Sequence, residues 1–229
     1  MFMDAGDKGG PVTTEEKWTY ASILVVIGGL FIAEIATNYE PAKLSALFIV
    51  LFWIPLLALH EFGHAIMSAL CGWHVGQVVI GMGRVLKQFQ IRSATIQIRL
   101  FPFEGFCASV PTSLKLIRIK SALIYFAGPG IELLFAGIVL WIVGPSAMFS
   151  AAGDNYWLLI WQSLALAATV QAVLNLIPHG VYVSGVQSPN DGLGIIYSFF
   201  WPIDHFSQMI GSTYNPEKDE WELKKGDGD

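Results

Sequence analysis

The feature that most constrains this chain is a His-Glu-x-x-His motif inside a long apolar run. The motif places His60, Glu61 and His64 between two flanks, residues 51–59 and 65–70, that are almost entirely apolar. On a helix, residues four apart share a face, so both imidazoles can reach one metal ion while Glu61 lies beside it. Ionised side chains in such a segment are unfavourable by about 2.5 kcal/mol or more each, and a metal site offsets that penalty. We therefore expect a zinc site on this helix.

The composition indicates a membrane protein. Hydrophobic residues make up 54% of the 229 residues, charged residues only 14%, and the mean hydropathy is +0.54. A soluble domain carries closer to a quarter charged residues. The two cysteines, Cys71 and Cys107, are too few for a disulfide framework, and neither is a favoured metal ligand.

Four segments are long enough to span a bilayer, which takes about 20 apolar residues. They are residues 18–37, 44–71, 121–143 and 156–177. A shorter apolar stretch at 193–203 is expected to lie at the interface or against the other helices. Polar tails at 1–17 and 211–229 flank a membrane-embedded domain at 18–210. We therefore predict an α-helical integral membrane protein with about four transmembrane helices.

The placement of Lys and Arg indicates the orientation. The segment 72–120, between the second and third spans, holds seven of the chain's thirteen basic residues, whereas the loop at 144–155 has none. We therefore expect segment 72–120 and both termini in the cytoplasm, in a multi-pass protein of the cell membrane. The motif would then lie in the half of its helix nearer the cytoplasm.

The segment between these two spans also carries a strand pattern. Residues 95–100 alternate strictly between polar and apolar side chains, and 75–80 and 85–91 are looser β-rich runs. We predict a small antiparallel sheet at the membrane surface, within a β-rich insertion at 72–115. Residues 102–106 are expected to turn the chain back toward the bilayer.

A zinc site with two His ligands needs a third protein ligand and an open position for water. Asp191 is a candidate, because it lies in an Asp-Gly pair after the helix break at Pro178. The alternative is an ordinary turn, since residues 188–192 are also strong turn formers.

The chain resembles the site-2 protease family of intramembrane zinc metalloproteases. The matching pieces are HEFGH at 60–64, a Pro-x-x-Gly segment at 102–105, FAGPG at 126–130, NLIP at 175–178 and the Asp-Gly pair at 191–192. The resemblance implies zinc held by His60, His64 and Asp191, with Glu61 as the general base. It also implies that Asn175 helps to hold the substrate backbone. Substrates would be membrane proteins, cut within or near their transmembrane segments, with the lipid bilayer and no nucleic acid as further partners.

Two departures from the family pattern leave alternatives open. Twelve residues, 179–190, separate Pro178 from Asp191, where the family usually has a short link. Glu132 stands where the family tends to have Asn. Its carboxyl group is expected to bind the metal or the substrate backbone, or to stay protonated and form a hydrogen bond between helices. His179, beside the break, is expected to be structural.

Two other classes of protein were weighed against the protease. One is a catalytically silent zinc-binding membrane scaffold, which has no need of a base such as Glu61. The other is a transporter that uses intramembrane His and Glu, which the lack of repeated halves disfavours.

Overall fold

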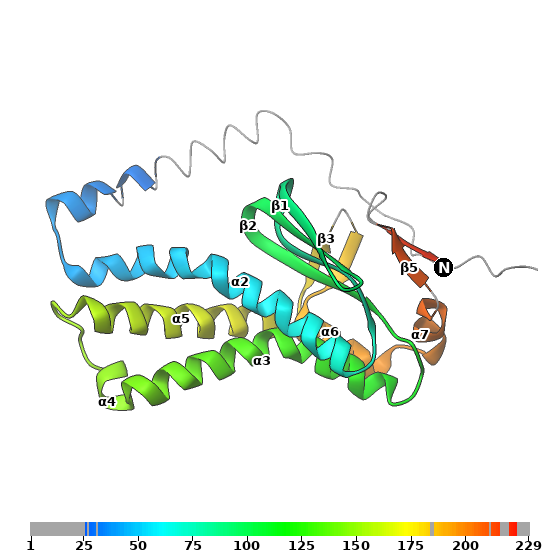
Figure 1. The fold of residues 1–229 in the computed structure, drawn as a ribbon. Helices are drawn as coiled ribbons and strands as arrows, with labels where there is room; N and C mark the ends of the chain where they lie inside the picture. The colour runs from blue at the N-terminus through cyan, green and yellow to red at the C-terminus, as the bar shows by residue number, and fades with distance from the viewer. Residues whose placement is uncertain are drawn as a thin grey trace, which may run out of the picture.

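The computed structural model describes residues 26, 28–30, 32–183, 186–210, 212–215 and 220–223. Figure 1 shows a bundle of long helices with a two-stranded hairpin beside one end. In chain order the elements are η1 (Pro41–Lys43), α2 (Leu44–Leu70), β1 (His74–Ile91), β2 (Ala94–Val110), α3 (Ile117–Val143), α4 (Pro145–Met148), α5 (Tyr156–Leu176), β3 (Gly180–Val183), β4 (Val186–Pro189), α6 (Asp191–Phe200), α7 (Ile203–Met209), β5 (Ser212–Asn215) and β6 (Glu220–Leu223).

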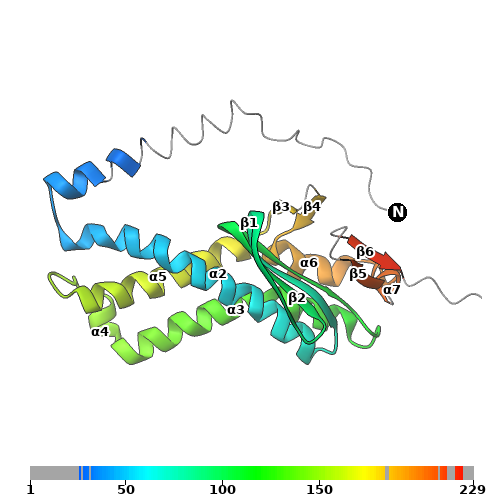
Figure 2. The same cartoon turned by 45° about the horizontal axis from the view of Figure 1, so that its top comes forward.

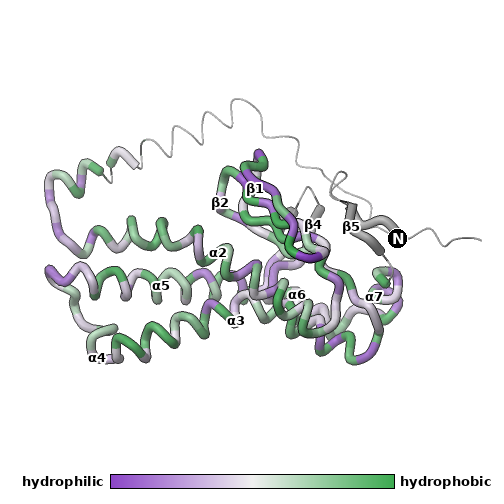
Figure 3. The backbone as a smooth tube through the Cα atoms, in the orientation of Figure 1, coloured by the Kyte–Doolittle hydropathy of each residue, from purple (hydrophilic) through white to green (hydrophobic). Residues whose placement is uncertain are grey.

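Among the described residues, three helical segments are long and apolar enough to cross a membrane. They are Pro41–Leu70, Ile117–Val143 and Tyr156–Leu176, and only 11%, 22% and 39% of their most apolar windows are buried inside the protein. Figure 3 shows hydrophobic residues along all three helices. Apolar side chains that face outward on this scale need lipid rather than water around them, so the protein is a membrane protein.

The fourth expected span, residues 18–37, falls mostly outside the described residues. Its described part is helical at 28–30 and at 32–37. Four spans therefore stay a prediction, whereas three are present in the structure.

The three long helices lie side by side, as Figures 1 and 2 both show. Small residues let them approach closely. Ala167 and Ala168 of α5 are fully buried and pack with Leu56 of α2 and Ala136 of α3. A Cβ added at Gly63 of α2 would lie 2.7 Å from the backbone oxygen of Ala127 in α3. The close approach of α2 and α3 occurs within the metal-binding motif itself.

The short helix α6 packs against the first half of α3. Ser198 and Ser121 share a hydrogen bond of 2.7 Å between their hydroxyl groups, and Arg118 donates to the backbone oxygen of Phe199 at the end of α6. As expected for its length, this apolar segment packs against other helices rather than spanning a membrane.

The predicted antiparallel sheet is present, but one segment of β1 pairs with two different segments of β2, which the sequence pattern does not indicate. Residues 77–80 of β1 pair on one side with residues 105–108 of β2. On their other side they pair with residues 95–98, which also belong to β2. The positive φ angles of Gly81 and Gly83 mark the bend that allows this. Residues 102–106, expected as a turn, instead continue β2. The hairpin lies alongside the second half of α2 (Figures 1 and 2).

Two further hairpins were not predicted. The pair β3–β4 lies at 180–183 and 186–189, between α5 and α6. The pair β5–β6 lies at 212–215 and 220–223, within the segment expected to be a polar tail.

Candidate metal centre

His60 and His64 lie one turn apart on the side of α2 that faces α3. Both side chains are buried, and their Nε2 atoms are 3.0 Å apart. The helical spacing of the motif therefore brings one nitrogen of each ring close enough to bind the same metal ion, as the sequence predicts.

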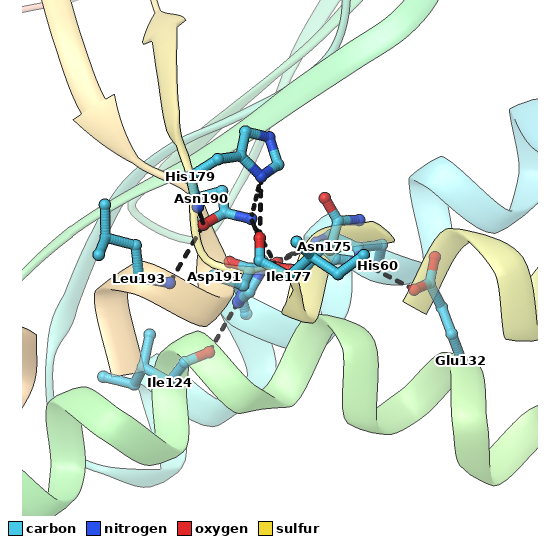
Figure 4. Close-up of polar contacts among 10 residues, drawn as sticks. His60, Ile124, Glu132, Asn175, Ile177, His179, Asn190, Asp191 and Leu193 are labelled. Carbon is cyan, nitrogen blue, oxygen red and sulfur yellow. Dashed lines mark hydrogen bonds and ion pairs between the residues drawn. The ribbon is translucent and has the colours of Figure 1, made fainter. Parts of the chain in front are cut away.

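The other ring nitrogen of each histidine contacts α3. His64 Nδ1 lies 2.7 Å from the backbone oxygen of Ile124, and His60 Nδ1 lies 3.1 Å from Glu132 Oε2. The backbone oxygen of Ile124 can only accept, so His64 Nδ1 carries the hydrogen and Nε2 of the neutral ring keeps a lone pair, which is the form of histidine that binds a metal. The contact with Glu132 orients the ring of His60. Figure 4 shows Glu132 reaching His60 from α3.

Asp191, the first residue of α6, completes the cluster. Its Oδ2 lies 2.9 Å from His60 Nε2 and its Oδ1 lies 3.3 Å from His64 Nε2. One ligand atom from each of the three residues lies within 4.8 Å of the other two. A carboxyl group at this position binds a metal in its ionised form.

The inserted residues 179–190 do not carry Asp191 away from the histidines. The first residue of β3 and the last residue of β4 lie side by side, because Gly180 pairs with Pro189. Asn190 closes this point (Figure 4): its Nδ2 donates to the backbone oxygens of Asn175 and Ile177 at 2.8 and 2.7 Å. Its Oδ1 accepts from the backbone N–H of Leu193 at 3.1 Å and so caps α6. Asn190 thereby fixes the start of α6, and Asp191 with it, to the end of α5.

Two glycines bring the backbone against this cluster. A Cβ on Gly128 of α3 would collide with His64 Nε2 and lie 2.6 Å from His60 Nε2, and a Cβ on Gly192 would collide with the backbone oxygen of Leu176. The sequence pattern indicated close packing near Gly128, and the structure shows that it is packing against the two ring nitrogens themselves.

These residues fit a zinc ion. Two ring nitrogens and two carboxylate oxygens face one another at 2.9 to 3.3 Å, and a cation bound between them would contact all three side chains. Two His and one carboxylate are the protein ligands of several catalytic zinc sites, in which a fourth position stays open. The chain therefore contains a group of residues that can hold a metal ion.

Glu61 directly follows His60 on α2 and lies beside the candidate ligands. Its side chain is 4% exposed, and its Oε2 atom has no hydrogen-bond partner within the described part of the chain. Gly105 of β2 faces it: a Cβ there would lie 2.6 Å from Glu61 Oε1. The β-hairpin therefore reaches the motif helix at the position of this carboxyl group.

A cavity of about 410 Å³ opens onto the cluster. Its walls include the three candidate ligands, Glu61 and Asn175, and several residues of β2 and α7. Glu132 does not line this cavity; it lies on α3 against Nδ1 of His60, and its role stays a prediction. His179 contacts Asn190 rather than the cluster, with 3.0 Å between Asn190 Nδ2 and His179 Nδ1.

The two cysteines are free and take no part in the cluster. Cys107 lines the cavity, and burial, together with the nearby Glu61, raises the pKa of its thiol. Sequence reasoning did not find Ile124 or Asn190. The backbone oxygen of Ile124 carries no sequence signal, whereas Asn190 directly before an Asp-Gly pair is a recognisable helix cap.

Comparison with known proteins agrees with this geometry. The model of peptidase family M50 matches residues 47–152, which contain the His-Glu-x-x-His motif and the Gly128 segment. The protease RseP of Yersinia pestis is 28% identical over 162 residues, which cover 63% of this chain and 34% of that protein. The membrane metalloprotease ARASP of Arabidopsis thaliana chloroplasts is 35% identical over 51 residues, which cover 22% of this chain and 11% of that protein.

The match thus spans only about a third or less of the length of these two relatives. The family-model match at residues 47–152 covers most of α2 and all of α3, the helix that packs against it. By its sequence motifs and these matches, the chain is similar to peptidase family M50 over residues 47–152, which supports its resemblance to the site-2 protease family of membrane metalloproteases.

Proposed function

We propose that this chain is a zinc metalloendopeptidase that hydrolyses peptide bonds within or near the transmembrane segments of other membrane proteins. The observation that carries the proposal is the convergence of His60, His64 and Asp191 beside a buried carboxyl group, Glu61, on a helix long enough to cross a membrane. Peptide hydrolysis by zinc needs these parts: a metal site with an open position and a base next to it.

In this mechanism His60, His64 and Asp191 hold the metal, while Glu132 and the backbone oxygen of Ile124 keep the two imidazoles in the metal-binding tautomer. Zinc bound there would polarise the scissile carbonyl and lower the pKa of its water to about 7. Glu61 accepts a proton from the attacking water and then delivers it to the nitrogen of the leaving amine. The unpaired, buried Oε2 of Glu61 suits this role, because no group in the described part of the chain forms a hydrogen bond with it.

A substrate must present an extended backbone at this site. In the described pairings, residues 105–108 of β2 pair only with 77–80, so one edge of this part of the strand is available. The same segment lies against Glu61 at Gly105 and lines the cavity. We propose that an unwound substrate segment adds to this edge as a further strand, which would supply backbone hydrogen bonds without regard to side chains. Asn175, in the cavity wall, is proposed as a second contact to the substrate backbone.

We also propose the orientation that the basic residues indicate, with segment 72–120 and both termini in the cytoplasm. The β1–β2 hairpin lies alongside the second half of α2 (Figure 1), and Gly105 of β2 faces Glu61 of the motif. In that orientation, cleavage takes place in the cytoplasmic half of the bilayer, and the cytoplasmic part of the substrate is released.

The test is a comparison of membrane proteins in cells that carry wild-type protein, Glu61→Gln or the control Asp154→Asn, which changes a carboxyl group in the loop before α5. Substrates should accumulate at full length only in the Glu61→Gln cells. Purified wild-type protein should cleave such a substrate, lose activity on zinc removal and regain it when zinc is restored. A silent zinc scaffold would give the same membrane-protein pattern in all three strains.

A further inference from the structure

The cavity wall contains polar groups that the protein itself leaves unsatisfied. Four cavity-lining residues carry a buried side-chain atom without a hydrogen-bond partner among the described residues: His60, Glu61, Trp73 and Gln171. His60 is accounted for by its contact with Glu132, and Glu61 by its proposed role as a base. Trp73 and Gln171 have no such explanation. A buried polar atom without a partner destabilises a fold, so it usually has a purpose.

Gln171 is the more enclosed of these two residues. It is 2% exposed, and its Oε1 atom is the unsatisfied one. Its neighbours on α5, Ala168 and Ala172, are fully buried, so the helix packs tightly around it. The amide reaches the cavity that also contains the metal cluster.

Gln171 and Asn175 lie four residues apart on α5, and both line the cavity. Residues at this spacing share a helix face. The end of α5 therefore presents two side-chain amides, one above the other, to the space in front of the candidate ligands. A side-chain amide has one acceptor and one donor group, as a peptide group has, and it can therefore bind a peptide backbone through both.

We propose that Gln171 is a substrate-positioning residue, which hydrogen-bonds the backbone of an extended peptide held across the metal centre. This inference rests on the proposed protease function. In the free enzyme the Oε1 atom stays without a partner, and the entering peptide supplies one. On this account the chain tolerates a less stable core because the same group is used in binding.

The test measures binding to zinc-loaded protein in detergent with two chelating probes. Acetohydroxamate contacts only the metal, whereas an acetylated tri-leucine hydroxamate also carries a peptide backbone. Wild-type protein should bind the tripeptide probe more tightly than acetohydroxamate. In Gln171→Met, which keeps the side-chain volume but removes the amide, the Kd of the tripeptide probe should rise about tenfold, which corresponds to about 1.4 kcal/mol. The Kd of acetohydroxamate and the zinc content should stay unchanged.

The matched control is Gln162→Met on the same helix. Gln162 donates from Nε2 to the backbone oxygens of Ala147 and Ser150, both at 2.9 Å, so its amide is satisfied by the protein. This variant should lower the melting temperature and leave both Kd values unchanged. Gln171→Met should raise the melting temperature, because it removes an unsatisfied buried atom.

Two results would overturn the inference. Equal binding of the tripeptide probe by wild type and Gln171→Met would make the amide irrelevant to the substrate, and an equal loss of both probes would make its role structural. A wild-type protein that binds neither probe would instead refute the proposed metalloprotease function, so the two failures are distinguishable.

Discussion

The contact between Glu132 and His60 predicts a graded loss of zinc affinity. Glu132 is completely buried, and its Oε2 lies 3.1 Å from His60 Nδ1, on the side of the ring away from the candidate ligand atom. Groups that orient metal-binding histidines in this way change metal affinity about 10–100-fold when they are lost. Gln keeps an acceptor oxygen at nearly the same place, so Glu132→Gln should lie near the lower limit, about tenfold or 1.4 kcal/mol. Leu has no acceptor, so Glu132→Leu should lie near the upper limit, about 100-fold or 2.7 kcal/mol.

The assay is a competition titration of purified variants against a chromophoric zinc chelator, with Asp191→Ala measured alongside. Both Glu132 variants should still bind zinc at saturation, and Glu132→Gln should keep part of the cleavage rate. Loss of zinc from Glu132→Gln to the extent seen in Asp191→Ala would make Glu132 a ligand. Wild-type affinity in Glu132→Leu would show that the contact does not orient His60.

Three other predictions concern the surroundings of the cluster. Gly128→Ala should abolish zinc binding, because its Cβ would collide with His64 Nε2 and lie 2.6 Å from His60 Nε2; the control Gly137→Ala, with nothing within 4 Å, should bind zinc normally in the same titration. Asn190→Ala should weaken zinc binding and lower the melting temperature, because it removes the two hydrogen bonds from Asn190 to Asn175 and Ile177 at the end of α5, together with the cap on Leu193 of α6; unchanged values for both would mean that Asp191 is positioned otherwise. In intact cells, a cysteine at Lys87 should react with a membrane-impermeant reagent only from the cytoplasmic side and one in the loop 144–155 only from the opposite side, and the reverse result would invert the topology.

The sequence alone predicted the parts of the site that depend on local spacing. Residues four apart on a helix share a face whatever surrounds them, so His60 and His64 were paired correctly in space. Asp191 was predicted as a partner of theirs from its Asp-Gly pair and from the family resemblance, and the structure brings it to both ring nitrogens. The three described spans were evident because lipid requires about 20 apolar residues in a row.

The remaining features depend on contacts between distant segments. Alternating residues predict a strand but not its partner, so the double pairing of residues 77–80 could not be read from the pattern. The position of Glu132 behind His60 follows from how α2 and α3 pack, which the apolar pattern of neither helix determines. The inserted segment 179–190 is too short for a strand pattern to be recognised in the sequence. Only the structure shows that it forms a hairpin and that Asn190, at its end, binds the backbone of Asn175.

The central claim is that His60, His64 and Asp191 form one zinc site with Glu61 as its base. The most direct measurement is the zinc content of purified wild-type protein, Asp191→Ala and Glu61→Gln, together with the cleavage rate of each. We predict about one zinc per chain in the wild type and in Glu61→Gln, most zinc lost from Asp191→Ala, and cleavage by the wild type alone. Full zinc content in Asp191→Ala, or loss of zinc from Glu61→Gln, would contradict the claim.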